Sequence, residues 1–288
     1  MTLSARDPVG SVVTLWRYPV KSMLGEELNA SDVTERGLLG DRAYALVDGA
    51  DGKIASAKNP RKWPRMFEFR AALLADSDPP ASLPAVRITL PDGDLVTSAQ
   101  ADHDERLSRA LDRAVTLQAA EPGVNRPDAI PSRRHRAGTA EEYWPDMDGL
   151  DYRDTVTDFE LPQGTFFDCA AVHVLTTATL DQLREFFPGG RFEVRRFRPN
   201  IVVDTSEHHR GFAEDAWIGH TIQIGDQVRL SITGPCPRCV MTTLAQADLP
   251  KDSGILRTAA QHNGVNVGVY ASVAHGGKIR RGDPIWLD

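Results

Sequence analysis

The chain has 288 residues, 41% of them hydrophobic, and a formal net charge of −7. This is enough for one large or two ordinary domains with a sizeable core. The acidic balance, broken only by a basic cluster at residues 133–136, argues against nucleic acid as the main partner. Three cysteines fit a reducing compartment better than a disulfide scaffold. The chain start lacks a signal peptide's apolar core, and no apolar run approaches the roughly 18 residues that cross a bilayer. We therefore expect a cytoplasmic protein with no membrane partner.

The first predicted strand covers residues 11–18, which are rich in β-branched and aromatic side chains. Pro19 ends or bends this strand, and the dipeptide Lys21-Ser22 follows at once. Taken alone, Lys21 is best interpreted as a solvated surface lysine.

A second strand is predicted at residues 43–47, after the sequence Gly-Leu-Leu-Gly-Asp-Arg of residues 37–42. The two glycines indicate tight backbone, and Asp-Gly-Ala-Asp-Gly at residues 48–52 predicts a hairpin turn. Arg42 stands next to Asp41, so an ion pair between them is one interpretation of this arginine.

The rest of the first half is interpreted as packing elements and one basic loop. Strands are predicted at residues 67–73 and 86–90, and a short helix at residues 104–114. We interpret residues 57–64 as a solvated loop; the alternative is a rim that attracts an anionic cofactor or redox partner.

Residues 119–149 lack periodicity and are rich in Pro, Gly, Arg and acidic residues, as in an inter-domain connection or a lid. They divide the chain into a first module at residues 9–118 and a second at residues 150–288.

The second module opens with a predicted strand at residues 172–177 and a helix at residues 180–187 behind a threonine cap. His173 alternates with apolar neighbours and is interpreted as a sheet histidine rather than a ligand. Cys169 is interpreted as an inert buried thiol.

The sequence Phe-Arg-Pro-Asn ends at Asn200 and precedes an apolar run. Pro199 disfavours helix for Arg198, so we expect Arg198 and Asn200 to project from a rigid extended segment. A basic strand edge that prevents aggregation is the alternative.

Residues 227–233 alternate apolar and polar side chains and predict a strand. Gly-Pro-Cys-Pro-Arg-Cys-Val-Met-Thr-Thr follows at residues 234–243, which we expect to place Cys236 and Cys239 on a stiff turn between two strands. Arg238 puts a cation beside both sulfurs and favours thiolate. A metal ligand or a nucleophile fits this pattern best.

Other interpretations of the cysteine pair are weaker. A structural zinc site needs four ligands, and only Cys169 remains. A redox pair would begin a helix, and residues 240–243 are poor helix material. A buried hydrophobe or a disulfide stays open with less support.

The segment Gly-Pro-Cys-x-Arg-Cys followed by Thr-Thr resembles the signature of the MOSC family, the sulfurase C-terminal domain family. Tyr-Pro-Val-Lys-Ser at residues 18–22, Gly-x-x-x-Asp-Arg at residues 37–42 and Phe-Arg-Pro-Asn at residues 197–200 agree with it. The agreement spans almost the whole chain. It is closest to the two-module branch that includes the amidoxime-reducing component.

The resemblance implies an α+β, mostly β protein of two β-barrel-like modules with a molybdenum cofactor in the cleft between them. By position in the motifs, Cys239 would ligate the metal, as suits a soft thiolate and a soft metal. The cofactor contacts would be Lys21, Ser22 and Arg42 at the phosphate, Arg198, Asn200 and Arg238 at the pterin, and Asp168, by a looser match, near the metal. An ammonium and a hydroxyl on a rigid turn are sound phosphate ligands.

The implied activity is the reduction of N-hydroxylated small molecules by removal of their oxygen atom. No iron–sulfur cysteine set is present, so an external electron-transfer protein would be the donor. The alternatives are a sulfur carrier with a persulfide at Cys239 or Cys236, and a non-catalytic cofactor carrier.

The chain departs from the amidoxime-reducing branch after Thr243, where residues 244–252 intervene before a predicted helix at residues 253–262. We expect this segment to line the pocket. Its acids, Asp248 and Asp252, would then favour a cationic amidoxime over an anionic substrate; the alternative, and the more common case, is that they are solvated loop acids.

Overall fold

The computed structural model describes residues 7–74, 83–120, 138–147, 153–162, 164–205 and 210–288. The basic cluster at residues 133–136 lies outside these ranges. The described fold is mostly β with four α-helices, which confirms the predicted fold class. Within the described residues, no helix combines the length and the apolar character needed to cross a bilayer.

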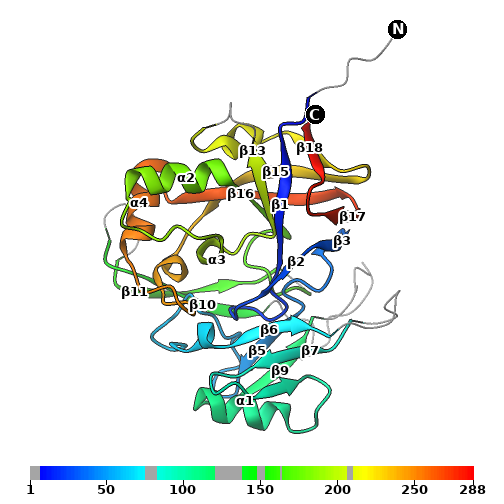
Figure 1. The fold of residues 1–288 in the computed structure, drawn as a ribbon. Coiled ribbons are helices and arrows are strands. Elements are labelled where there is room, and N and C mark those ends of the chain that lie inside the picture. Colours follow the sequence, from blue (N-terminus) through cyan, green and yellow to red (C-terminus); the bar gives the residue numbers. More distant parts are fainter. Residues whose placement is uncertain (1–6, 75–82, 121–137, 148–152, 163, 206–209) are drawn as a thin grey trace.

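A closed seven-strand barrel forms the upper part of the molecule in Figure 1. The ring closes because β1 pairs antiparallel with β13 as well as with β18, so residues from both predicted modules build it. Around the barrel the strands are β13 (Ile201–Thr205), β12 (Val172–Thr176), β16 (Asn266–His275), β15 (Val228–Pro237), β14 (Thr221–Ile224), β18 (Pro284–Leu287) and β1 (Gly10–Arg17). The short β2 (Glu26–Leu28) pairs with the far end of β1.

The barrel core follows from period-two alternation along its strands. In β15, Val228, Leu230 and Ile232 are buried while Arg229 and Thr233 are exposed. Fully burying a side chain of this size stabilises the fold by roughly 1.5–3 kcal/mol. The predicted strand at residues 227–233 is thus confirmed, and β15 continues beyond it to Pro237.

Three helices cover one side of the barrel: α2 (Thr177–Phe186), α3 (Val194–Phe197) and α4 (Gly254–Asn263). Leu180, Leu183, Phe197 and Ile255 share a buried cluster between the helices and the sheet. Thr176 caps α2 by accepting a hydrogen bond from the backbone N–H of Thr179 at 3.2 Å, as the predicted threonine cap requires.

The lower part of Figure 1 holds most of the remaining first half of the chain, around a second hydrophobic core. Its elements are β5 (Tyr44–Asp48) paired with β9 (Val115–Ala119), the sheet β6 (Arg70–Leu73), β7 (Val86–Thr89) and β8 (Leu95–Thr97), and α1 (His103–Leu111). The predicted strand at residues 67–73 is partly wrong, because its start lies in the 3₁₀-helix η1 (Met66–Glu68). A further small sheet joins β3 (Ala30–Thr34), β4 (Gly37–Leu38) and β17 (Gly277–Arg280).

A hairpin of β10 (Thr139–Trp144) and β11 (Thr155–Glu160) covers the loop that follows β5. Lys53, Lys58 and Lys62 of that loop form ion pairs with the hairpin carboxylates Glu141, Glu142 and Asp158. The hairpin therefore fixes the loop.

The predicted turn and strand around the two cysteines are wrong in detail. Cys236 lies inside β15, and Cys239 stands at the start of the 3₁₀-helix η3 (Val240–Thr243). Threonine hydroxyls support this helix: Thr242 Oγ1 donates to the carbonyl of Cys239 at 3.0 Å, and Thr243 Oγ1 to that of Val240 at 2.8 Å. These bonds and the burial of all four helix residues outweigh their low helix propensity. A second 3₁₀-helix in this half, η2 (Ala213–Trp217), packs against the barrel.

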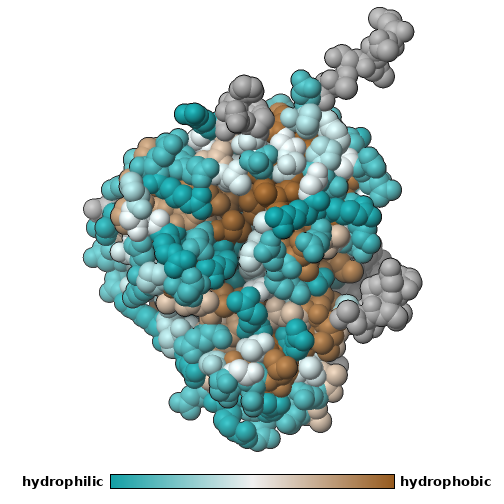
Figure 2. All heavy atoms as spheres, in the orientation of Figure 1, coloured by the Kyte–Doolittle hydropathy of each residue, from teal (hydrophilic) through white to brown (hydrophobic). Residues whose placement is uncertain are grey.

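On the face shown in Figure 2, hydrophilic residues predominate, and hydrophobic ones gather toward the middle of the molecule.

Candidate cofactor site

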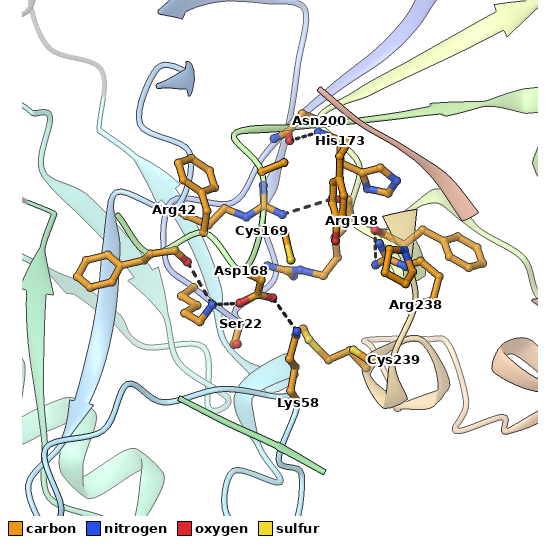
Figure 3. Close-up of a pocket in the computed structure, with 18 residues that line it drawn as sticks. Ser22, Arg42, Lys58, Asp168, Cys169, His173, Arg198, Asn200, Arg238 and Cys239 are labelled. Carbon is orange, nitrogen blue, oxygen red and sulfur yellow. Dashed lines mark hydrogen bonds and ion pairs between the residues drawn. The ribbon is translucent and has the colours of Figure 1, made fainter. Parts of the chain in front are cut away.

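One cavity is lined by residues of both halves and encloses about 700 Å³ of empty space, part of it open to solvent. All eight residues that the motifs single out line it: Lys21, Ser22, Arg42, Asp168, Arg198, Asn200, Arg238 and Cys239. Figure 3 labels all of them except Lys21 and shows the labelled side chains converging from separate segments of the chain. Their roles toward a cofactor remain predictions.

Two lysines share one carboxylate at the centre of this cavity. Lys21 Nζ is hydrogen-bonded to Asp168 Oδ1 and donates to the carbonyl of Phe166 at 3.1 Å, while Lys58 Nζ lies 3.5 Å from Asp168 Oδ2. Lys21 is only 4% exposed, which excludes the surface-lysine interpretation. Burial lowers the pKa of Lys21 despite Asp168. Burial alone would raise the pKa of Asp168, but the two ammonium groups outweigh it and hold that pKa below its usual range.

Three cavity residues have left-handed backbone: Ser22 (φ 65°), Arg42 (φ 46°) and Arg198 (φ 53°). Such a conformation costs roughly 1–2 kcal/mol in a residue with a Cβ. Strain of this kind clusters at functional sites, where the surrounding structure fixes it. At Ser22, Oγ accepts the backbone N–H of Ala57 at 3.0 Å, so the hydroxyl hydrogen stays available to a ligand.

Arg42 combines both of its predicted interpretations, since it forms the ion pair with Asp41 and also lines the cavity. Asp41 also accepts Asn200 Nδ2 at 2.9 Å. Asn200 Nδ2 also donates to the carbonyl of Trp16 at 3.3 Å, and Asn200 Oδ1 accepts the backbone N–H of His173 at 3.0 Å. The Asn200 amide is thus used within the protein, and it fixes Asp41, β1 and β12 relative to one another.

Arg198 does not lie in the predicted extended segment, because it ends α3 in the left-handed region. Pro199 disfavours a further α-helical residue, and this turn presents two successive carbonyls to two arginines. The carbonyl of Phe197 accepts Arg238 Nη2 at 2.9 Å, and that of Arg198 accepts Arg42 Nη2 at 3.4 Å. The Arg198 side chain itself donates to the carbonyl of Met23 at 2.7 Å. Burial, and then Arg42, lower the pKa of Arg198 to about 10, which leaves it charged at neutral pH.

Arg238 favours thiolate at Cys239, as expected, but burial outweighs this effect. Arg238 Nη1 donates to Cys236 Sγ at 2.6 Å. Burial raises the pKa of Cys239 to about 11, although Lys58 and Arg238 oppose it. Without a metal, Cys239 is therefore a thiol at neutral pH, and metal binding would release its proton.

Five cations line the cavity, and only three have a carboxylate partner. Asp168 pairs with Lys21 and Lys58, Glu142 with Lys58 at 3.3 Å, and Asp41 with Arg42. Among the described residues, Arg198 and Arg238 make no ion pair, and Arg238 Nε has no hydrogen-bond partner. This surplus of positive charge and unused donor fit an anionic ligand.

The described residues offer no complete metal site of their own. In the part of the chain that the structure describes, no three His, Cys, Asp or Glu side chains are grouped to hold a metal ion. A metal at Cys239 would therefore take most of its ligands from a cofactor.

Sequence reasoning misjudged two residues of this cavity. Lys58, interpreted as part of a solvated loop, has a side chain only 14% exposed and lines the cavity. Cys169, interpreted as buried, is exposed and also lines it. Only the rim alternative for residues 57–64 pointed toward Lys58. His173 is a buried sheet histidine as predicted; burial and Arg238 lower its pKa to about 3, which keeps it neutral.

The expectation that residues 244–252 line the pocket is wrong, since none of them lines the cavity. Asp248 pairs with Arg191 and Arg195, and Asp252 Oδ1 accepts the backbone N–H of Gly254 at 2.8 Å. The preference for a cationic amidoxime thereby loses its basis.

Family models match both halves of the chain. Residues 9–129 match the MOSC N-terminal beta barrel domain, and residues 162–286 match the MOSC domain. The chain is a two-module MOSC protein.

Distant relatives match almost the whole chain. The chain is 24% identical to the mitochondrial amidoxime reducing component 2 of Rattus norvegicus, over 96% of this chain and 83% of that protein. It is 24% identical to the mitochondrial amidoxime-reducing component 1 of Homo sapiens, over 97% and 83%. Among solved structures, the YUAD protein from Bacillus subtilis aligns at 12% identity with a TM-score of 0.44, over 96% of this chain and 94% of that one. The fold described above does not depend on that weak likeness.

Proposed function

We propose that the cavity of this MOSC protein holds a molybdenum cofactor with Cys239 as the metal ligand, and that the loaded protein reduces N-hydroxylated small molecules. The observation that carries the proposal is that one cavity holds the Cys239 thiol and five cations, two of which have no carboxylate partner among the described residues. A thiolate suits a soft, redox-active metal. The local positive charge suits an anionic cofactor in a chain whose net charge is −7.

Different cavity residues would bind different parts of the cofactor. Lys21, Ser22 and Arg42 offer an ammonium, a hydroxyl and a guanidinium to its phosphate. Arg198 and Arg238 would face its pterin side with charge that no carboxylate among the described residues neutralises. Asn200 acts as a positioning residue through Asp41 and the backbone of His173.

The reaction is a two-electron reduction, for which the bound cofactor supplies the redox chemistry. The N–O bond of the substrate breaks, its oxygen leaves as water after uptake of two protons, and an external electron-transfer protein supplies both electrons. The distant relatives are amidoxime-reducing components at 24% identity, which supports N-hydroxylated substrates for this chain.

The persulfide alternative has little support at Cys236, whose thiol is fully buried and bonded to Arg238. The other alternative, a non-catalytic cofactor carrier, would bind the cofactor but would not turn over a substrate, whereas a reductase would.

The test is anaerobic oxidation of a reduced viologen by molybdenum-loaded protein, with a panel of N-hydroxylated compounds. We expect oxidation that depends on the substrate and is absent in Cys239→Ser. No oxidation across the panel, with molybdenum present in the protein, would favour the carrier.

A further inference from the structure

Tyr18 lies directly behind two of the cavity arginines. Its ring centroid is 4.1 Å from Cζ of Arg198 and 4.6 Å from Cζ of Arg42. The tyrosine is only 2% exposed and does not line the cavity, whereas both arginines do. One aromatic ring thus contacts two guanidinium groups that come from separate segments of the chain.

The ring, and not the hydroxyl, makes these contacts. Tyr18 Oη is buried and has no hydrogen-bond partner among the described residues. The backbone fixes the ring: the N–H of Tyr18 donates to Asp41 Oδ1 at 2.7 Å, and its carbonyl accepts the N–H of Arg42 at 2.9 Å. Phenylalanine would therefore preserve the arrangement.

An aromatic ring differs from a carboxylate in what it leaves to a ligand. A carboxylate holds a guanidinium and cancels its charge, whereas a ring face attracts the cation and leaves its charge in place. Arg198 shows this difference, because its contacts in the described structure are the Met23 carbonyl and the rings of Tyr18 and Phe67.

We propose that Tyr18 is a positioning residue that holds Arg198 and Arg42 against its ring, so that Arg198 keeps its charge free for an anionic group. The chemical class of that group is a small anion, for which inorganic phosphate serves as the probe. The inference rests on the proposed function only in taking this anion to belong to the cofactor.

Calorimetric titration of the full, cofactor-free chain with inorganic phosphate tests the proposal. We expect Tyr18→Leu to weaken phosphate binding roughly tenfold and Tyr18→Phe to stay within about twofold of the wild type. Trp217→Leu is the control for loss of a buried ring, because Trp217 is also 2% exposed but belongs to the barrel core. It should leave phosphate binding unchanged.

A second readout does not require Tyr18→Leu to fold. The guanidinium Nε–H resonances of Arg42 and Arg198 should be shifted by the ring current in the wild type and in Tyr18→Phe. The proposal would be overturned by unshifted resonances or by wild-type phosphate affinity in Tyr18→Leu. It would also be overturned by equal losses of affinity in the Phe and Leu variants, or by a wild type that binds no phosphate. Phosphate binding that depends on the ring, in a chain that never takes up molybdenum, would support Tyr18 and refute the proposed function.

Discussion

Arg238 Nη1 donates to Cys236 Sγ at 2.6 Å, so the arginine between the two signature cysteines is directed at the first and not at the second. Cys236 is fully buried beneath the cavity. The relationship gives the first cysteine a structural task, which is to hold the guanidinium that faces the cavity.

Replacing Cys236 tests that task. Cys236→Ala removes an acceptor of the half-buried Arg238 guanidinium and should lower the free energy of unfolding by about 1–3 kcal/mol. Cys236→Ser keeps a small acceptor and should lose less. Urea unfolding measures both, and an alanine variant as stable as the wild type would show that the contact is dispensable.

Lys58 offers a test with a matched control in the same loop. Lys58→Met removes one cation of the cavity, a charge-assisted contact worth about 1.5–3 kcal/mol, and should lower cofactor retention under competitive extraction roughly tenfold or more. Lys62 has the same 14% side-chain exposure but pairs with Asp48, Asp51 and Glu141 and does not line the cavity. Equal molybdenum retention in Lys58→Met and Lys62→Met would count against a role for Lys58.

The motifs led to the cavity but not to its geometry. Several of the cavity residues could be predicted from the type and order of residues in three motifs. These motifs are residues 18–22, 37–42 and 197–200. The left-handed turn at Arg198 depends on hydrogen bonds from residues elsewhere in the chain. Arg42 donates to the carbonyl of Arg198, and Arg238 donates to that of Phe197.

The position of Lys58 could not be predicted from the sequence either, because it also depends on residues that are distant in the chain. Its side chain is held by Glu142 at 3.3 Å and lies over the ring of Phe159 at 4.5 Å, both on a hairpin more than 80 positions away. A loop composition alone cannot tell such a side chain from a solvated one.

Arg196 of α3 connects this helix to the segment after Cys239 by hydrogen bonds. It is fully buried and donates to the carbonyls of Thr242 at 3.1 Å, Leu244 at 3.2 Å and Pro250 at 2.8 Å. Arg196→Met would remove three charge-assisted hydrogen bonds, one of them to the buried Thr242, and should cost roughly 3 kcal/mol or more in unfolding free energy.

The neighbour Arg195 is the control for this variant. Its ion pairs with Glu193 and Asp248 lie nearer the surface, and Arg195→Met should cost less than about 1 kcal/mol. Similar losses in both variants, measured by urea unfolding, would contradict the assignment.

Glu214 predicts a pH dependence of stability. It is fully buried; burial raises its pKa, although the hydroxyls of Thr176 and Thr179 donate to it. Above an unfolded pKa of about 4.3, the native state keeps this proton longer than the unfolded state does. The unfolding free energy therefore falls as pH rises from that value, until the raised pKa is passed.

Glu214→Gln should remove this decline, because an amide does not titrate. The amide oxygen can still accept both hydroxyls, so the local structure is kept. Urea unfolding between pH 5 and 8 measures it, with Glu185→Gln, on the exposed side of α2, as the control. Parallel pH profiles for wild type and Glu214→Gln would show that Glu214 does not titrate in this way.

The most direct test of a molybdenum site at Cys239 is the molybdenum content per chain, by elemental analysis of protein made in a cofactor-competent host. Cys169→Ser is the matched control, because both thiols line the same cavity. We predict near-stoichiometric metal in the wild type and in Cys169→Ser, and almost none in Cys239→Ser. Equal molybdenum in Cys239→Ser and the wild type would contradict the account.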